Sequence, residues 1–318
     1  MWMDLTGMIQ NPAETQGDGQ RMSKEEYAAM KKQEREDMWM QIDAQAQEVF
    51  RDGESLQKFL DFMAGQYNMP RVSNLLLLYS QNPELHLVRS REEWRRENRY
   101  PQPDAKSYTY IIQTEYEKDG VTRQGYTVRK GYDVSETVGK PLEDRPKQPI
   151  QTLLGAVLKN QDVRLQIPEQ IPEGVQAQYI PKQRTIYIRN GMPEVTTFHA
   201  VNRELACARL DQHDGNYRRE KVNAQAYCAT YVVGKYYGID VSGFNLGAVA
   251  GMQENGQKDP QELRGFLNDV RNAAYSIRGH INRELREPEQ EFVADNLFAV
   301  GEGQKPAKSK KGKEQPER

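Results

Sequence analysis

Cysteine, histidine and long apolar runs are scarce in this chain of 318 residues, which has two cysteines and four histidines. Cys207 and Cys228 are too few for the disulfide framework of a small secreted protein, so reduced thiols in a cytoplasmic protein are expected. Apolar runs such as Leu75 to Tyr79 fall far short of the roughly 20 residues that span a bilayer. The first residues also lack the pattern of a secretory signal. The sequence therefore predicts neither membrane insertion nor secretion.

A strong charge of one sign is also missing, because the formal net charge is -2. A balance near zero argues against a protein that coats nucleic acid over its whole surface, although a local basic surface is still compatible with it. The apolar share of 37% indicates a modest core. A chain of this length is expected to divide into about two domains.

Polar segments suggest where the domains begin and end. Residues 1–22 are rich in Gln, Gly, Asp and Asn, and residues 300–318 consist mainly of Lys, Gly, Pro and Glu, so we expect disordered tails, with Met22 as an alternative start. Residues 140–149 are polar and punctuated by three prolines, which is typical of a linker. We therefore expect one domain over 23–139 and a second over 150–290.

The front half is expected to combine three helices with a hairpin. Helices are predicted over 23–51, over 54–67 and from Ser73 or Asn74, either of which can cap the third helix. Alternating apolar residues from Ser107, the Asp119-Gly120 pair and a second alternating run predict a β-hairpin, because Asp-Gly readily adopts the positive φ of a tight turn.

The back half is expected to be mostly helical. A helix near 152–159 should be followed by strands at 176–180 and 185–188, then by helices over 195–210 and 218–237, the latter ending at Gly238. A final helix begins at Asp259-Pro260 and carries a continuous apolar stripe of Leu263, Leu267, Val270, Ala274, Ile277, Ile281 and Leu285. Together the two halves predict an α+β protein.

A short motif in the back half suggests a family. Two expected strands precede the helical segment Arg203-Glu204-Leu205-Ala206-Cys207-Ala208, and the next helix ends in Tyr236-Tyr237-Gly238-Ile239-Asp240. This order resembles the zincin-like metallopeptidase domain of the ArdC and LtrC proteins, which usually carry His-Glu-Leu-Ala-His-Ala at the first segment. In that motif two imidazoles one helical turn apart hold zinc and the glutamate acts as general base. The resemblance covers about residues 40–290.

The resemblance places the two zinc-binding histidines on Arg203 and Cys207 and the acidic third ligand on Tyr227, so only the base, Glu204, is kept. Arginine stays protonated and has no lone pair for a metal, whereas a catalytic zinc needs three protein ligands. We therefore expect a degenerate site with no catalytic residues, no metal and no cofactor. One alternative is a rebuilt site from His199, Cys207 and Cys228; the simpler interpretation makes both cysteines small buried hydrophobes.

The front half carries further family-like segments, Ser73-Asn74-Leu75-Leu76-Leu77-Leu78-Tyr79-Ser80-Gln81-Asn82-Pro83 and Tyr132-Asp133-Val134-Ser135-Glu136-Thr137. They resemble the single-stranded-DNA-binding domain of the same family, although the glycines of its Gly and Lys rich loop are missing here. Cations beside aromatic faces suit sequence-tolerant binding of single strands. A solvated helix face with one buried Trp is the alternative. The candidate DNA-binding residues are Asn74, Trp94, Arg95, Arg96, Arg99, Tyr100, Lys106, Tyr108 and Tyr110.

The leading hypothesis is a non-catalytic ArdC/LtrC-like protein of a mobile or conjugative element that binds single-stranded DNA, with antirestriction as the activity that the family implies. A zinc metallopeptidase with an atypical site is one alternative. A scaffold that binds a protein partner in the inactive peptidase cleft is another.

Overall fold

The computed structural model describes residues 23–118, 120–142 and 147–286. The tails expected at 1–22 and 300–318 lie outside the described residues. The protein has an α+β fold, which confirms the class expected from the sequence. In the described part of the chain, no helix is both long and apolar enough to span a membrane.

The chain divides into two compact units. Of the described residues, unit 1 comprises those up to 142 and 245–268, and unit 2 comprises 147–244 and 269–286. The first division point falls inside the stretch expected to be a linker. Residues 245–268 differ from the expectation, because they pack with the front half and not with the back half.

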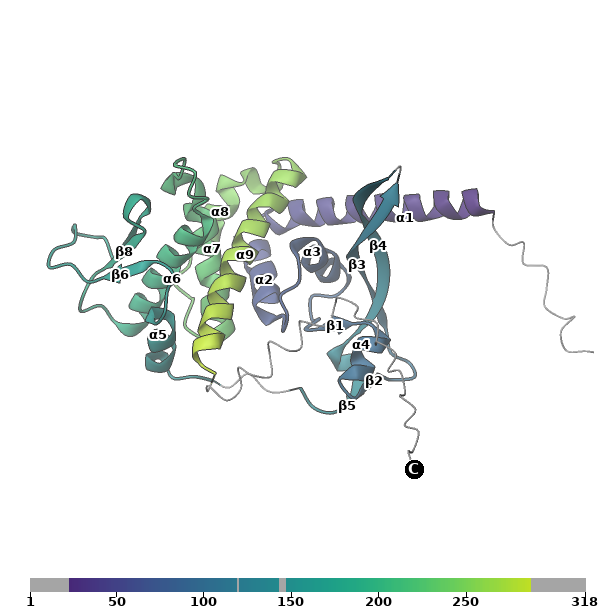
Figure 1. The fold of residues 1–318 in the computed structure, drawn as a ribbon, viewed down its shortest axis with the longest axis horizontal. Coiled ribbons are helices and arrows are strands. Elements are labelled where there is room, and N and C mark those ends of the chain that lie inside the picture. The colour runs from purple at the N-terminus through teal and green to yellow at the C-terminus, as the bar shows by residue number, and fades with distance from the viewer. Residues whose placement is uncertain (1–22, 119, 143–146, 287–318) are drawn as a thin grey trace, which may run out of the picture. The chain divides into compact units, whose positions relative to one another are not determined.

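Unit 1 begins with three helices, α1 (Lys24–Val49), α2 (Gly53–Gly65) and α3 (Val72–Gln81). Ser23 and Glu26 form a reciprocal capping box that fixes the start of α1. A small sheet in the order β1-β4-β3 follows, formed by β1 (Val88–Arg89), β3 (Ser107–Lys118) and β4 (Val121–Asp133) (Figure 1). The antiparallel register runs from Ser107 opposite Tyr132 to Lys118 opposite Val121, and Gly120 has a φ of 71°, so the expected hairpin is confirmed.

The sequence did not reveal several short elements of unit 1. These are α4 (Arg91–Arg96), β2 (Arg99–Pro101), its partner β5 (Thr137–Gly139), the turn η1 (Val134–Glu136), α8 (Leu246–Met252) and η3 (Glu254–Gly256). Helix α8 packs on α2. A Cβ on Gly53 would lie 2.6 Å from the backbone nitrogen of Gly247, so only glycine permits this close approach. This contact explains why 245–268 belong to unit 1.

Unit 2 consists of α5 (Ile150–Leu158), β6 (Arg164–Gln166), β7 (Ala177–Ile180), the turn η2 (Pro181–Gln183), β8 (Thr185–Ile188), α6 (Glu194–Leu210) and α7 (Arg219–Tyr237). Its sheet has the order β6-β8-β7, with β6 parallel and β7 antiparallel to β8. Helices α6 and α7 pack against each other, and α7 ends at Gly238 with a φ of 70°. The expected helices and two strands are confirmed; β6 was not predicted.

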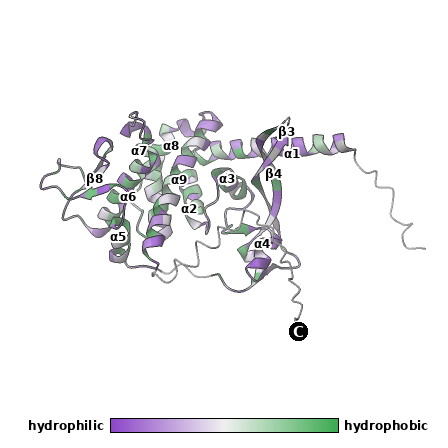
Figure 2. Ribbon diagram, in the orientation of Figure 1, coloured by the Kyte–Doolittle hydropathy of each residue, from purple (hydrophilic) through white to green (hydrophobic). Residues whose placement is uncertain are grey.

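The last helix, α9 (Pro260–Glu284), contains the division between the units, which falls after Asn268. Leu263, Leu267, Val270, Ala274, Ile277 and Ile281 are all at most 1% exposed, which confirms the predicted apolar stripe over these positions. Its last predicted member, Leu285, follows the end of α9 and is half-buried. Helices such as α6, α7 and α9 carry hydrophilic and hydrophobic residues together, as expected for helices with one buried face (Figure 2).

Candidate functional site

The four positions expected to form a degenerate metal site lie on two neighbouring helices of unit 2. Arg203, Glu204 and Cys207 belong to α6, and Tyr227 belongs to α7. The guanidinium carbon of Arg203 lies 5.3 Å from the centre of the Tyr227 ring, a cation-π contact across the two helices. Arg203 and Cys207 are separated by one helical turn and therefore face the same side of α6.

Glu204 is held by three donors. Its side chain is 2% exposed, and Oε2 accepts hydrogen bonds from the backbone N–H of Tyr179 and from Nη1 of Arg219, each at 2.7 Å. The second guanidinium nitrogen of Arg219 donates to Oε1, which completes a bidentate ion pair. A general base needs an oxygen lone pair directed at a water, and fixed bonds take three of the roughly four lone-pair sites of this carboxylate.

Arg219 is the functional residue that sequence reasoning missed. The other donor to Glu204 is the backbone amide of Tyr179. The guanidinium at the first position of α7 was not predicted, because the sequence spacing between positions 204 and 219 gives no periodic signal. The ion pair raises the pKa of Arg219, chiefly through its hydrogen bonds to Glu204.

Arg203 makes different contacts from Arg219. It is half-buried, and Nη2 donates to the side-chain oxygen of Asn223 on α7 at 2.7 Å. Its Nε is buried and has no hydrogen-bond partner within the described chain. Arg203 therefore keeps unused donor capacity.

The two cysteines are buried thiols. Burial, reinforced by the negative charge of Glu204, raises the pKa of Cys207 to about 11. Burial alone raises the pKa of Cys228. Both sulfurs are therefore protonated at neutral pH, whereas the thiolate is the form that attacks electrophiles and binds metals.

His199 does not join the cysteines. Its Nε2 lies 2.7 Å from the backbone oxygen of Asp240, its ring packs edge-on to Phe244, and burial lowers its pKa. Over residues 23–118, 120–142 and 147–286, no group of three or more His, Cys, Asp or Glu side chains is placed to hold a metal ion. The structure therefore does not support the alternative site built from His199, Cys207 and Cys228.

A pocket of about 260 Å³ opens beside Arg203 and Glu204. We call it the β7 pocket, because one wall is the segment that leads into and forms β7, and the other walls come from α6 and the start of α7. Its lining residues are Gly174, Val175, Gln176, Ala177, Gln178, Ala200, Arg203, Glu204 and Arg219.

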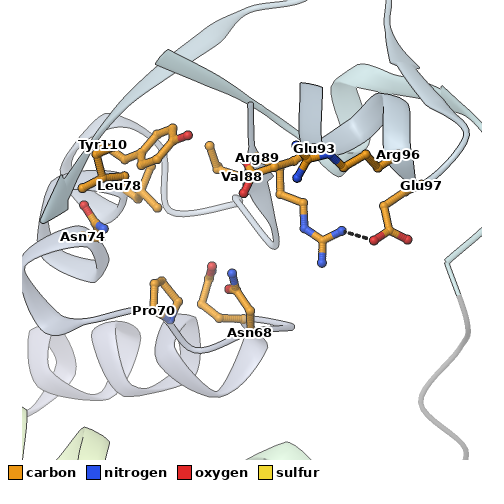
Figure 3. A pocket seen from close by; sticks show the side chains of 12 residues that line it. Asn68, Pro70, Asn74, Leu78, Val88, Arg89, Glu93, Arg96, Glu97 and Tyr110 are labelled. Carbon is orange, nitrogen blue, oxygen red and sulfur yellow. Dashed lines mark ion pairs between the residues drawn. The ribbon is translucent and has the colours of Figure 1, made fainter. Parts of the chain in front are cut away.

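A second pocket, of about 400 Å³, lies in unit 1 between α3, α4 and β3 (Figure 3). We call it the α3–α4 pocket; it is lined by Gln66, Asn68, Pro70, Asn74, Leu78, Val88, Arg89, Glu93, Arg96, Glu97, Tyr110 and Ile112. The guanidinium of Arg89 forms an ion pair with Glu97, with 2.9 Å between Nη1 and Oε1, and its carbon lies 5.4 Å from the centre of the Trp94 ring. These two contacts hold the guanidinium in place. Tyr110 is half-buried, and burial raises its pKa.

Three of the nine candidate DNA-binding residues are buried, which corrects the surface role expected for them. Trp94 is fully buried and its indole N–H donates to the backbone oxygen of Tyr132 at 2.8 Å. Tyr108 is 3% exposed. Arg99 is 9% exposed, and its guanidinium donates to the hydroxyl of Thr137 at 2.9 Å and to that residue's backbone oxygen at 2.8 Å. These side chains stabilise the α4 region and present no face to a ligand.

Asn74 has a positioning role. Its amide donates to the backbone oxygen of Ile111 at 2.9 Å and accepts from the same residue's N–H at 2.8 Å. Gln81, two turns later on α3, makes the same pair of bonds to Thr109. Helix α3 thereby covers the free edge of β3. The expectation that Ser73 or Asn74 caps α3 was wrong: Arg71 stands at the cap position, and the Asn74 side chain binds the strand.

Replacing Asn74 with alanine is expected to lower the free energy of unfolding by about 1 to 3 kcal/mol, the range for leaving buried polar groups without partners. The reason is that both backbone groups of Ile111 lose their side-chain partner. Urea unfolding of the variant measures the loss. Ser73→Ala, on the same helix and half-buried, is the control and should change stability by less than about 0.5 kcal/mol. Equal stability of both variants would contradict the positioning role.

Five candidate residues remain available to a ligand. Arg95, Arg96, Tyr100 and Lys106 are exposed, and Tyr110 lines the α3–α4 pocket together with Arg96. Lys106 lies 5.4 Å from the Tyr108 ring, and Tyr100 is 53% exposed. Residues 88–132 contain ten Lys and Arg against seven Asp and Glu, whereas the whole chain is net negative.

Comparisons with known proteins give a structural likeness. No protein-family model matches the sequence, and no curated protein matches it. The structure is similar to that of the antirestriction ArdC protein from the R388 plasmid. The metal-free form aligns over 68% of this chain and 87% of that one, with 12% identity and a TM-score of 0.40. The Mn(II)-bound form aligns over 67% of this chain and 89% of that one, with 11% identity and a TM-score of 0.43. At this level of similarity no residue role passes from that protein to this chain.

Proposed function

We propose that unit 1 binds single-stranded DNA at the α3–α4 pocket and the exposed face of α4. The observation that carries the proposal is the convergence of Arg89, Arg96 and Tyr110 on one pocket. Guanidinium groups contact phosphates and an aromatic ring stacks on a base, a combination that binds single strands with little regard to sequence. Duplex DNA keeps its bases stacked inside, so Tyr110 gains no base contact from it.

On the same proposal, unit 2 has no peptidase activity. Arg219 engages both oxygens of Glu204, and Arg203 and Tyr227 occupy two positions where the family resemblance expects metal ligands. The motifs that resemble ArdC and LtrC proteins make this chain a candidate antirestriction protein of a mobile element, whose DNA-binding half acts on the incoming single strand. A metallopeptidase with an atypical site is disfavoured by the same contacts.

Charge reversal on α4 tests the DNA proposal. Arg95→Glu combined with Arg96→Glu is expected to weaken binding of a fluorescein-labelled 20-base oligonucleotide at least tenfold, equally for different sequences, because the lost contacts are to phosphates. The slope of log affinity against log salt should fall by about 0.7 for each phosphate contact removed. Fluorescence anisotropy over a salt series measures both quantities.

The matched control uses two exposed cations of unit 2, Lys182→Glu with Arg184→Glu, which change the net charge by the same amount. These should bind DNA as wild type does. Arg99 is left unaltered because it is buried and its loss would disturb folding. Tighter binding to duplex than to single strands, or equal loss in both pairs of variants, would refute the proposed site.

A further inference from the structure

The β7 pocket has an open strand edge as one wall. Among the strands that the structure describes, β7 is at the end of its sheet and pairs with β8 alone. The backbone oxygen of Gln176 accepts from Arg189 N–H at 2.8 Å, so Gln176 faces β8. In an antiparallel pair the backbone groups of successive residues point alternately to the two sides, so those of Ala177 and Tyr179 point away from β8. A strand with such an edge can pair with another extended chain.

Glu204 blocks only part of that edge. It accepts the N–H of Tyr179 at 2.7 Å and thereby occupies the edge at that residue. Ala177, two residues earlier, lines the β7 pocket with its neighbours Gln176 and Gln178. The backbone of Ala177 is therefore directed toward the pocket, across from α6.

The pocket also contains a cation without a counter-ion. Glu204 and Arg219 neutralise each other, whereas Arg203 has only the neutral side chain of Asn223 and the ring of Tyr227 as partners within the described chain. Its Nε is buried without a hydrogen-bond partner. Arg189 lies outside the lining and binds the segment that leads into β7, because its guanidinium donates to the backbone oxygens of Val175 at 2.8 Å, Pro172 at 2.6 Å and Ile171 at 3.5 Å. Among the residues that line the pocket, Arg203 and Arg219 stand against the single carboxylate of Glu204, so the lining carries a net positive charge.

We propose that the β7 pocket binds an extended acidic peptide segment of a partner protein. The segment adds to the free edge of β7 at Ala177 and places one Asp or Glu carboxylate against Arg203. A guanidinium with free donors binds a carboxylate through paired hydrogen bonds, and these bonds are strengthened in a partly desolvated site. The volume of about 260 Å³ suits one such side chain and the adjoining backbone. The proposal is independent of DNA binding by unit 1.

Peptide binding to the full-length protein tests this assignment. The probe is a fluorescein-labelled decapeptide of alternating Val and Glu, compared with its Val and Gln counterpart and with a Val and Glu form N-methylated at alternate residues. The acidic peptide is expected to bind at least tenfold more tightly than the Gln peptide, and N-methylation should abolish binding because it removes the edge-pairing N–H groups. Fluorescence anisotropy gives the dissociation constants.

Variants assign the contact to a residue. Arg203→Gln, which keeps a donor for Asn223, should weaken binding of the acidic peptide at least tenfold and leave the affinity for single-stranded DNA unchanged. The affinity of Arg203→Lys for the acidic peptide should lie between that of wild type and that of Arg203→Gln, because lysine keeps the charge and loses the paired hydrogen bonds. Lys182→Gln, an exposed cation of the same unit, should have no effect. A melting curve establishes that each variant is folded.

Three results overturn the proposal. They are equal binding of the Glu and Gln peptides, unchanged binding by folded Arg203→Gln, and full binding of the N-methylated peptide. Loss of oligonucleotide affinity in Arg203→Gln without any peptide binding would instead assign a phosphate ligand to Arg203. Whether unit 1 also binds DNA is tested separately, by the Arg95→Glu and Arg96→Glu variant of α4.

Discussion

Replacing Arg219 with methionine is expected to lower the free energy of unfolding by about 3 kcal/mol, the lower end of the range for breaking a buried ion pair. The change leaves the Glu204 carboxylate, which is 2% exposed, without its bidentate partner. The Tyr179 amide alone does not neutralise the charge. Arg219 itself is 33% exposed, so water can enter after its removal and reduce the cost. Urea unfolding of wild type and variant measures the difference.

A double-mutant cycle separates the ion pair from packing. Glu204→Gln added to Arg219→Met should recover most of the lost stability, because glutamine keeps an acceptor for Tyr179 N–H and carries no charge. Arg218→Met, at the exposed position next to Arg219, is the matched control and should change stability by less than about 0.5 kcal/mol. An Arg219→Met protein as stable as the control would mean that Glu204 needs no counter-ion.

Elements with a strong periodic or turn signal could be predicted from the sequence. The apolar stripe of α9 repeats at helical spacing over about five turns, and a pattern of that length is compatible with few other structures. The hairpin is predicted by apolar residues that alternate with polar ones on both sides of the Asp-Gly pair. Helix α7 ends where Gly238 can take a positive φ. In these cases residues close in sequence decide the structure.

The contacts that define the sites depend on residues far apart in sequence. Nothing near Arg219 marks it as the partner of Glu204, because the two residues lie on different helices and the sequence does not reveal the path of the loop between them. The cluster of Arg and aromatic residues at 89–110 looked like one surface, yet Trp94, Arg99 and Tyr108 are buried by the β2–β5 pairing and the sheet. Composition gives the residue types, while tertiary packing decides which side chains reach solvent. The return of α8 to unit 1 escaped prediction for the same reason.

Rebuilding a zinc site is expected to require Arg219 to be removed as well as ligands to be added. Wild type should bind no stoichiometric zinc, and neither should the double variant Arg203→His with Cys207→His, because two ligands are too few for a catalytic-type site. Adding Tyr227→Glu supplies the third ligand that the family resemblance expects. Elemental analysis after dialysis counts the metal, and competition with a zinc-binding dye gives its affinity.

In the triple variant the guanidinium of Arg219 still provides the positive charge that balances Glu204. A zinc ion placed beside this pair is repelled by Arg219 and finds the carboxylate already neutralised. Arg219→Met removes the repulsion and leaves Glu204 to be balanced by the metal, so the quadruple variant should bind zinc at least tenfold more tightly than the triple one. Arg218→Met added to the triple variant is the control and should give no gain. If the quadruple variant binds zinc no better than this control, the charge of Arg219 does not oppose a metal at this place; if the double variant binds one zinc per chain, Tyr227 does not stand where the third ligand is needed.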